Sequence, residues 1–302
     1  MPYSAPVVSR LAPTPSGYLH LGNAVNFLLT WLIVRRVYGV LHLRIDDLDR
    51  ARLRPAYLEN IFRTIDWLGI DYDHGPSGPE DFERNFSQLH HLAEYEALLQ
   101  ALRQKPGLLY ACRCSRTQIQ SQANGGIYSG SCQPQNLDFE APESAWRAHV
   151  GASTIVSFTD LWLGPVALEL SRELGDFVVR KKDGLPAYQI GSIVDDVRLG
   201  VTLIVRGVDL LPSTAAQRWL AGFTPDTSPF LQTRLVHHSL LPGPDGGKLS
   251  KSQQQPLDRG IMHESTSPRP VFEAVARLLN LPLEAGRSLA ALRAAFENAA
   301  IS

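Results

Sequence analysis

The chain has 302 residues, 29 basic and 30 acidic side chains, a net charge of −1 and a hydrophobic fraction of 44%. This composition is typical of a globular protein, and the balanced charge provides no overall attraction to nucleic acids or membranes. The N-terminus lacks a signal-peptide pattern, and no apolar run reaches the roughly 20 residues of a membrane span. Three cysteines cannot form a disulfide framework. We therefore expect a cytoplasmic protein with no membrane partner.

The first seventy residues predict alternating strands and helices. Gly39 provides a stop for the first helix, and Pro55 lies near the first turn of the second. The predicted elements are strand Val7–Leu11, helix Asn23–Tyr38, strand Val40–Ile45 and helix Pro55–Leu68. This order is typical of the beginning of a parallel α/β sheet.

The rest of the chain predicts a differently composed block before the α/β pattern returns. The block contains a helix, a glycine-rich turn and two strands, the second followed by the hairpin turn "KKDGLP": Phe82–Gln104, Asn124–Gly126, Ala152–Phe158 and Asp176–Arg180. A strand at Thr202–Val205 and a helix at Ser213–Ala221 follow, with Ser213 as the expected N-cap. Two short helices are expected after Gln255.

The stretch "PTPSGYLHLGNA", Pro13–Ala24, joins the first strand to the first helix. A tight turn that enters a helix N-terminus can bind an anion, because free backbone N–H groups and the helix dipole point to one place. Gly17 and Gly22 allow a ligand to approach the backbone, and His20 can donate a hydrogen bond to a phosphate oxygen. The alternative is a loop that only packs the helix onto the strand.

A second segment, "GGKLSKS" at Gly246–Ser252, carries two lysines three residues apart. Such a basic loop can offset the charge of a polyphosphate in a transition state. Taken alone, it can equally be a solvated turn.

Together the two segments resemble known motifs. "HLGN" at His20–Asn23 and "KLSKS" at Lys248–Ser252 are similar to the HIGH and KMSKS motifs of class I aminoacyl-tRNA synthetases. The stretches "RLAPTPSGYLHLGN", "LRIDDLDRAR", "YQIGSIVDD" and "IVRGVDLLPST" resemble the glutamyl group. The chain ends soon after the lysine motif, so we expect no anticodon-binding domain. This truncated pattern resembles the glutamyl-Q tRNA(Asp) synthetase family.

The resemblance implies a fold with four parts. Residues 1–76 and 188–255 would form the halves of a Rossmann-like catalytic domain with a parallel sheet. Residues 77–187 would form an inserted α+β acceptor-type domain with a zinc site, and residues 256–302 a short helical tail. A monomer is expected.

The resemblance also implies the chemistry. The family activates glutamate with ATP and Mg²⁺, without tRNA, and transfers it onto queuosine at the wobble position of tRNA(Asp). His20 and Lys251 would be catalytic, and ATP would be bound by His20, Gly22, Asn23, Lys248 and Lys251. Glutamate would be bound by Arg10, Leu11, Ala12, Pro13, Thr14, Asp46, Tyr188 and Arg206.

Asp46 departs from the family pattern, which reads "RIED" where this chain reads "RIDD". The family's glutamate would meet the substrate ammonium group. Aspartate keeps the charge but is one methylene shorter, so the backbone must shift or a water must fill the gap. The alternative is that Asp46, Asp47 and Asp49 are only a polar strand end.

The three cysteines, "CRC…YSGSC", suggest a structural Zn²⁺ site, because thiolates in a reducing compartment suit this ion. A tetrahedral zinc site needs a fourth ligand besides Cys112, Cys114 and Cys132. The resemblance points to Tyr128, whereas spacing alone also allows His149, His90 or an empty site.

Two other functions remain open at this stage. One is a minimal glutamyl-tRNA synthetase that charges a tRNA 3′ end, and the other is a non-catalytic paralogue. The sequence does not reveal which groups recognise the tRNA, since arginines such as Arg234, Arg259, Arg269 and Arg287 are scattered.

Overall fold

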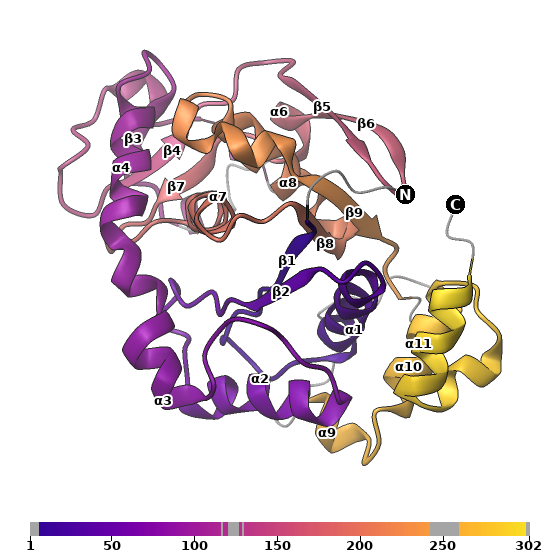
Figure 1. Cartoon of the computed structure of the whole chain (residues 1–302). Coiled ribbons are helices and arrows are strands. Elements are labelled where there is room, and N and C mark those ends of the chain that lie inside the picture. Colours follow the sequence, from indigo (N-terminus) through magenta and orange to yellow (C-terminus); the bar gives the residue numbers. More distant parts are fainter. Residues whose placement is uncertain (1–5, 116, 120–126, 129, 242–259, 300–302) are drawn as a thin grey trace. The chain divides into compact units, whose positions relative to one another are not determined.

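The computed structural model describes residues 6–115, 117–119, 127–128, 130–241 and 260–299 (Figure 1). The predicted turn at Asn124–Gly126 and the lysine motif lie outside the described residues. The chain divides into two compact units, the first from residues 1–87, 202–208 and 236–302, the second from residues 88–201 and 209–235. Among the helices of the described part, none has both the length and the apolar character needed to cross a membrane.

The first unit is built on a parallel strand pair. Strand β1 pairs with β2, placing Arg10 opposite His42, and the Ser9 hydroxyl joins β1 to β8 by donating to the Leu203 carbonyl over 2.8 Å. Strand β8 in turn pairs with β9. These strands are β1 (Val8–Leu11), β2 (Val40–Leu43), β8 (Leu203–Gly207) and β9 (Arg234–His238). The arrangement confirms the α/β class that the opening segment predicts.

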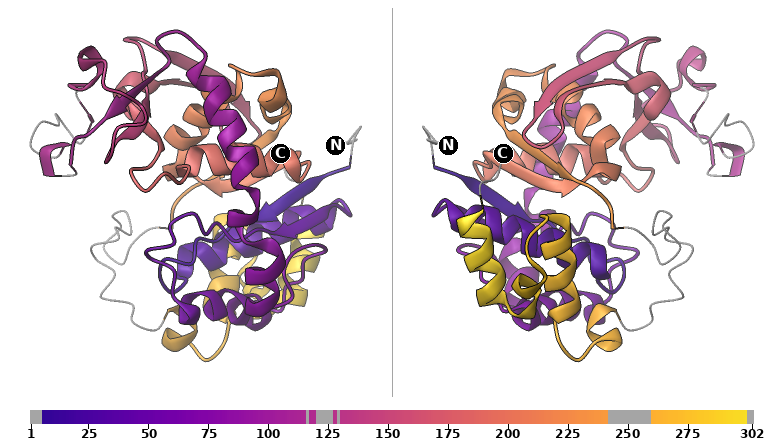
Figure 2. Two further views of the ribbon diagram at one scale, coloured as in Figure 1. Left: turned by 90° about the vertical axis from the view of Figure 1, so that its left-hand side faces the viewer. Right: turned by 90° about the vertical axis from the view of Figure 1, so that its right-hand side faces the viewer.

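Helix α1 (Leu21–Arg36) is mostly apolar and largely buried. It packs against β1, β2 and β8 and also against the C-terminal helices. The right-hand view of Figure 2 shows α10 and α11 side by side in yellow. The other helices of the first unit are α2 (Pro55–Leu68), α3 (Pro79–Asp81), α9 (Ile261–Glu264), α10 (Arg269–Leu278) and α11 (Leu289–Asn298). The bounds of α2 are those predicted, and Gly69 ends it at φ +70°.

The second unit contains an antiparallel sheet in the order β3-β4-β7 and a separate hairpin, β5-β6. The predicted "KKDGLP" turn is confirmed, with the Lys181 amide donating to the Leu185 carbonyl and Gly184 at φ +85°. Its strands are β3 (Leu109–Cys112), β4 (Ala145–Ala148), β5 (Ile155–Asp160), β6 (Gly164–Glu169) and β7 (Phe177–Arg180). Its helices are α4 (Leu92–Arg103), α6 (Leu170–Glu173), α7 (Tyr188–Arg198) and α8 (Leu211–Ala221).

Several expected boundaries are wrong. Helix α1 spans Leu21–Arg36 rather than Asn23–Tyr38, and the left-handed residue after it is Tyr38, at φ +53°, rather than Gly39. The helix expected over Phe82–Gln104 is interrupted at Ser87, whose backbone is extended and whose hydroxyl donates to Asp47. Helix α8 begins at Leu211 with Pro212 in its first turn, so Ser213 is not its N-cap. Strand β5 begins at Ile155 rather than Ala152, because Ser153 adopts φ +59° in the preceding turn.

The partly exposed carboxylate of Asp73 predicts a mild loss of stability in acid. Burial favours the neutral form of Asp73, but hydrogen bonds from Arg35 and the Leu41 amide prevail and hold the pKa of Asp73 below its ordinary value. A lowered folded-state pKa stabilises the protein above the ordinary aspartate pKa, and this stability is lost as pH falls through the folded pKa. Since Asp73 is 39% exposed, we expect a contribution of about 1 kcal/mol or less.

The measurement is urea unfolding between about pH 5 and pH 2 for the native protein and Asp73→Asn. The native protein should lose more unfolding free energy across this range than the variant. Equal losses would contradict the assignment.

Candidate functional site

His20 is the N-cap of α1, and its imidazole ring makes one of the capping hydrogen bonds. The Gly22 amide donates to His20 Nδ1 over 3.1 Å, and the His20 amide donates to Asn23 Oδ1 over 3.0 Å. This reciprocal pair is a capping box. Because Nδ1 accepts a hydrogen bond, the neutral ring carries its proton on Nε2, which can act as a donor.

The surroundings of this cap suit an anion. The first turn of α1 has no acidic residue, so the helix dipole and the N-terminal amides are not offset there. A Cβ on Gly22 would lie 3.1–3.2 Å from the His20 ring, so a side chain at this position would require the imidazole to shift slightly. The predicted ATP-binding residues His20, Gly22 and Asn23 therefore form one local unit.

The structure brings the predicted Leu11–Thr14 segment beside Asp46. The Arg44 amide donates to the Leu11 carbonyl over 2.9 Å, and the Asp46 amide donates to the Pro13 carbonyl over 2.8 Å. These bonds continue the β1-β2 pairing past the ends of both strands. Asp46 is consequently fixed one strand away from the segment expected to bind glutamate.

Asp46 has a partner that the sequence reasoning missed. Arg44 Nε donates to Asp46 Oδ1 over 2.7 Å and Arg44 Nη2 to Oδ2 over 3.1 Å, and both side chains are buried. Such a bidentate pair fixes the plane of the carboxylate. The spacing was the available signal, because residues i and i+2 share one face of an extended segment.

The neighbouring acid, Asp47, binds two side chains of the first unit. Its Oδ2 accepts from Arg50 and from the Ser87 hydroxyl, each over 2.6 Å. This buried carboxylate joins the end of the β2 segment to the point where the expected helix breaks.

Two predicted arginines lie on the same strand layer. Arg10 on β1 and Arg206 on β8 are both buried, and β8 lies alongside β1. Buried guanidinium groups on neighbouring strands suit a substrate with two carboxylates. Tyr188 opens α7 in the second unit, where it is half-exposed. Lys248 and Lys251 lie outside the described residues.

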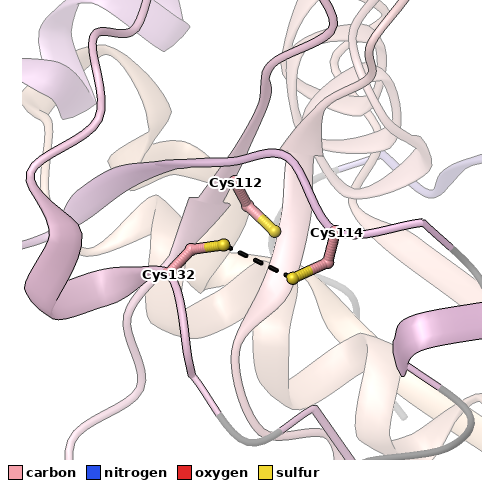
Figure 3. Close-up of side chains that lie close together, drawn as sticks. All are labelled: Cys112, Cys114 and Cys132. Atoms are coloured by element: carbon pink, nitrogen blue, oxygen red, sulfur yellow. Dashed lines mark hydrogen bonds between the residues drawn. The ribbon is translucent and has the colours of Figure 1, made fainter.

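The three cysteines converge in the second unit, with Cys114 and Cys132 facing each other (Figure 3). Their sulfur atoms lie within 4.8 Å of one another, and Cys114 Sγ is 3.4 Å from Cys132 Sγ. Sulfur ligands about 2.3 Å from a tetrahedral Zn²⁺ are separated by roughly 3.8 Å, so the cluster fits this ion.

Tyr128 places its hydroxyl beside the three thiols. The oxygen lies 3.4 Å from Cys112 Sγ and 3.3 Å from Cys114 Sγ, whereas His149 Nδ1 is bound to Asp176. Among the described residues, the metal-capable group contains no histidine. The geometry thus favours Tyr128 over His149 or His90 as the fourth ligand.

The hydrogen bonds within the cluster affect its acidity. Burial opposes ionisation of Cys132, but hydrogen bonds from Tyr128 and the backbone lower the pKa of Cys132 to about 7. Burial and the neighbouring thiols raise the pKa of Tyr128. Cys132 is thus the thiol of this cluster whose pKa is shifted toward the thiolate, the form that binds cations.

Comparison with known proteins places these features in a family. Residues 6–299 match the family model described as tRNA synthetases class I (E and Q), catalytic domain. The chain is 40% identical over 249 residues to the glutamyl-Q tRNA(Asp) synthetase of Pseudomonas putida strain KT2440, covering 82% of this chain and 77% of that protein. It is 38% identical over 290 residues to the protein of that name from Symbiobacterium thermophilum, covering 90% and 86%.

A solved structure agrees in fold. The glutamate-tRNA synthetase of Elizabethkingia anophelis superposes with a TM-score of 0.67 at 24% identity, covering 82% of this chain and 53% of that one. The present chain thus spans about half the length of that solved chain.

Proposed function

Since the chain belongs to the family of class I tRNA synthetase catalytic domains for glutamate and glutamine, we propose that it joins glutamate to queuosine at the wobble position of tRNA(Asp). In the first step a glutamate carboxylate oxygen attacks the α-phosphorus of ATP, and pyrophosphate leaves. In the second step a queuosine hydroxyl attacks the acyl carbon of glutamyl-adenylate, and AMP leaves. The first step needs no tRNA.

The observation that carries this proposal is the agreement between the local geometry and two relatives of that name that match most of the chain. His20 Nε2–H would donate to the phosphate as charge develops, while the α1 amides hold the nucleotide. Arg10 and Arg206 would bind the carboxylates of glutamate, and Asp46, oriented by Arg44, would accept from its ammonium group. Lys248 and Lys251 would complete the phosphate site, and Mg²⁺ would accompany ATP.

The second unit would hold one structural Zn²⁺ through Cys112, Cys114, Tyr128 and Cys132. The ion would tie β3 to the segment around Cys132, which follows it by twenty residues. We further propose that residues 77–187 act as the acceptor-binding insertion of a cytoplasmic monomer.

The deciding experiment is charging with radiolabelled glutamate. Queuosine-bearing tRNA(Asp), the same tRNA with guanosine at the wobble position, and tRNA(Glu) are compared, together with queuosine-bearing tRNA(Asp) that lacks its 3′-terminal adenosine. The proposal expects labelling of both queuosine-bearing tRNAs and pyrophosphate exchange without any tRNA. Charging of tRNA(Glu) alone would favour the minimal synthetase, and no exchange at all would favour a non-catalytic paralogue.

For the metal, we expect about one zinc per chain by elemental analysis. Cys132→Ser should lose most of this zinc and the thermal stabilisation that zinc confers, because one of three thiolates is removed. Ser131→Ala, which changes a neighbour of the cluster but no thiol, is the matched control. A full zinc content in Cys132→Ser would contradict the assignment.

A further inference from the structure

The residue before His20 is held from both sides by segments distant in sequence. Asn60 Oδ1, on α2, accepts from the Leu19 amide over 2.9 Å. The Leu19 carbonyl accepts from the Ile261 amide, also over 2.9 Å. All three residues are at most 5% exposed, so water does not replace these bonds.

The second of these bonds acts directly on His20. The Leu19 carbonyl and the His20 amide belong to one planar peptide unit. Ile261 holds the carbonyl side of this unit, and Asn23 Oδ1 holds its amide side over 3.0 Å. The Leu19–His20 peptide unit therefore cannot rotate unless one of these hydrogen bonds breaks.

Gly260 makes the close approach of Ile261 possible. It adopts φ +72°, and a Cβ there would lie 2.9 Å from Tyr18 Cβ and 3.1 Å from the Leu19 carbonyl oxygen. Gly260 and Ile261 are also the first described residues after the segment that contains the lysine motif. The bond between Ile261 and Leu19 thus fixes the residue before His20 and also the first described residues after this motif.

We propose that Asn60, Gly260 and Ile261 form a clamp on Leu19, and that Asn60 is a positioning residue for His20. This inference rests on the proposed function, because the clamp matters through the orientation of the His20 ring toward ATP. Asn60 acts through the Leu19 backbone, whose amide donates to its side chain.

The test compares variants of similar side-chain shape at buried positions on α2. Asn60→Leu removes the acceptor, Asn60→Asp retains one, and Thr64→Val removes a buried hydroxyl that donates within its own helix, to the Asn60 carbonyl. Gly260→Ala disturbs the clamp from its other side. The readouts are the kcat and the KM for ATP of glutamate-dependent pyrophosphate exchange, and the ring signals of His20 by selective histidine NMR.

We expect Asn60→Leu and Gly260→Ala to lower kcat about 10-fold and to shift the His20 signals, since small misplacements of a reacting group are costly. Asn60→Asp and Thr64→Val should stay within about threefold of the native protein. In a His20→Asn background, Asn60→Leu should cause little further loss, because two residues acting through one group are not additive.

Native kcat and unmoved His20 signals in folded Asn60→Leu would overturn the clamp, as would losses that add fully to those of His20→Asn. If the native protein shows no pyrophosphate exchange, the proposed function fails. The NMR comparison then still decides whether Asn60 orients His20.

Discussion

Replacing His20 with asparagine is expected to lower the kcat of glutamate-dependent pyrophosphate exchange about 100-fold or more, as removal of one transition-state donor does in other enzymes. His20 Nδ1 already accepts from the Gly22 amide, so Nε2–H is the group that would stabilise charge on the phosphate. A bond that strengthens only in the transition state lowers kcat and leaves the KM for ATP nearly unchanged.

The choice of asparagine separates catalysis from folding. An asparagine oxygen can still accept from the amides of the first turn, so the cap of α1 is preserved. His20→Ala removes the cap as well, and we expect a further cost of about 1 kcal/mol in unfolding free energy. Exchange by His20→Asn within about threefold of the native rate would contradict a catalytic role for the ring.

Removing the carboxylate of Asp195 is expected to destabilise the protein by roughly 3–5 kcal/mol, the range for breaking a buried charged network by deleting one partner. Asp195 lies on α7 with a fully buried side chain. It accepts from Gln88 Nε2 over 2.7 Å, from the Tyr95 hydroxyl over 2.9 Å and from Arg198 over 2.9 Å. In Asp195→Ala, the buried Gln88 and Tyr95 donors lose this acceptor.

Urea unfolding of Asp195→Ala measures this cost, and Glu140→Ala provides the matched control in the same unit. Glu140 forms an ion pair with Arg103 over 2.8 Å but is 60% exposed. Its removal should cost no more than about 1 kcal/mol, as is usual for surface pairs. Similar costs for the two variants would show that the Asp195 network is not a major source of stability.

Features encoded over short distances along the chain were predictable. Helix α2 has the predicted bounds because Pro55 sets its first turn and Gly69 provides the left-handed stop. The turn at His20 was predicted from its prolines and glycines, whereas the cap was not, because the helix was expected to begin at Asn23. The Arg44–Asp46 pair is also local, and the i, i+2 pattern was the overlooked signal.

Other features depend on distant residues, and local patterns carried no sign of them. The helix expected over Phe82–Gln104 breaks because the Ser87 hydroxyl binds Asp47, forty residues earlier. Strands β3 and β4 were missed because each is short and fully buried, so neither has the alternation that identifies a half-exposed strand.

The sequence by itself therefore determined the order of strands and helices over residues 7–68, the turn at His20 and the three cysteines of the candidate metal site. Those properties depend on residue type and on neighbours within about one helical turn. Only the tertiary structure decided that Tyr128, rather than a histidine, lies beside the three thiols, and that Asn60 and Ile261 hold Leu19. Such contacts join residues separated by up to 242 positions, because burial selects partners by position in space.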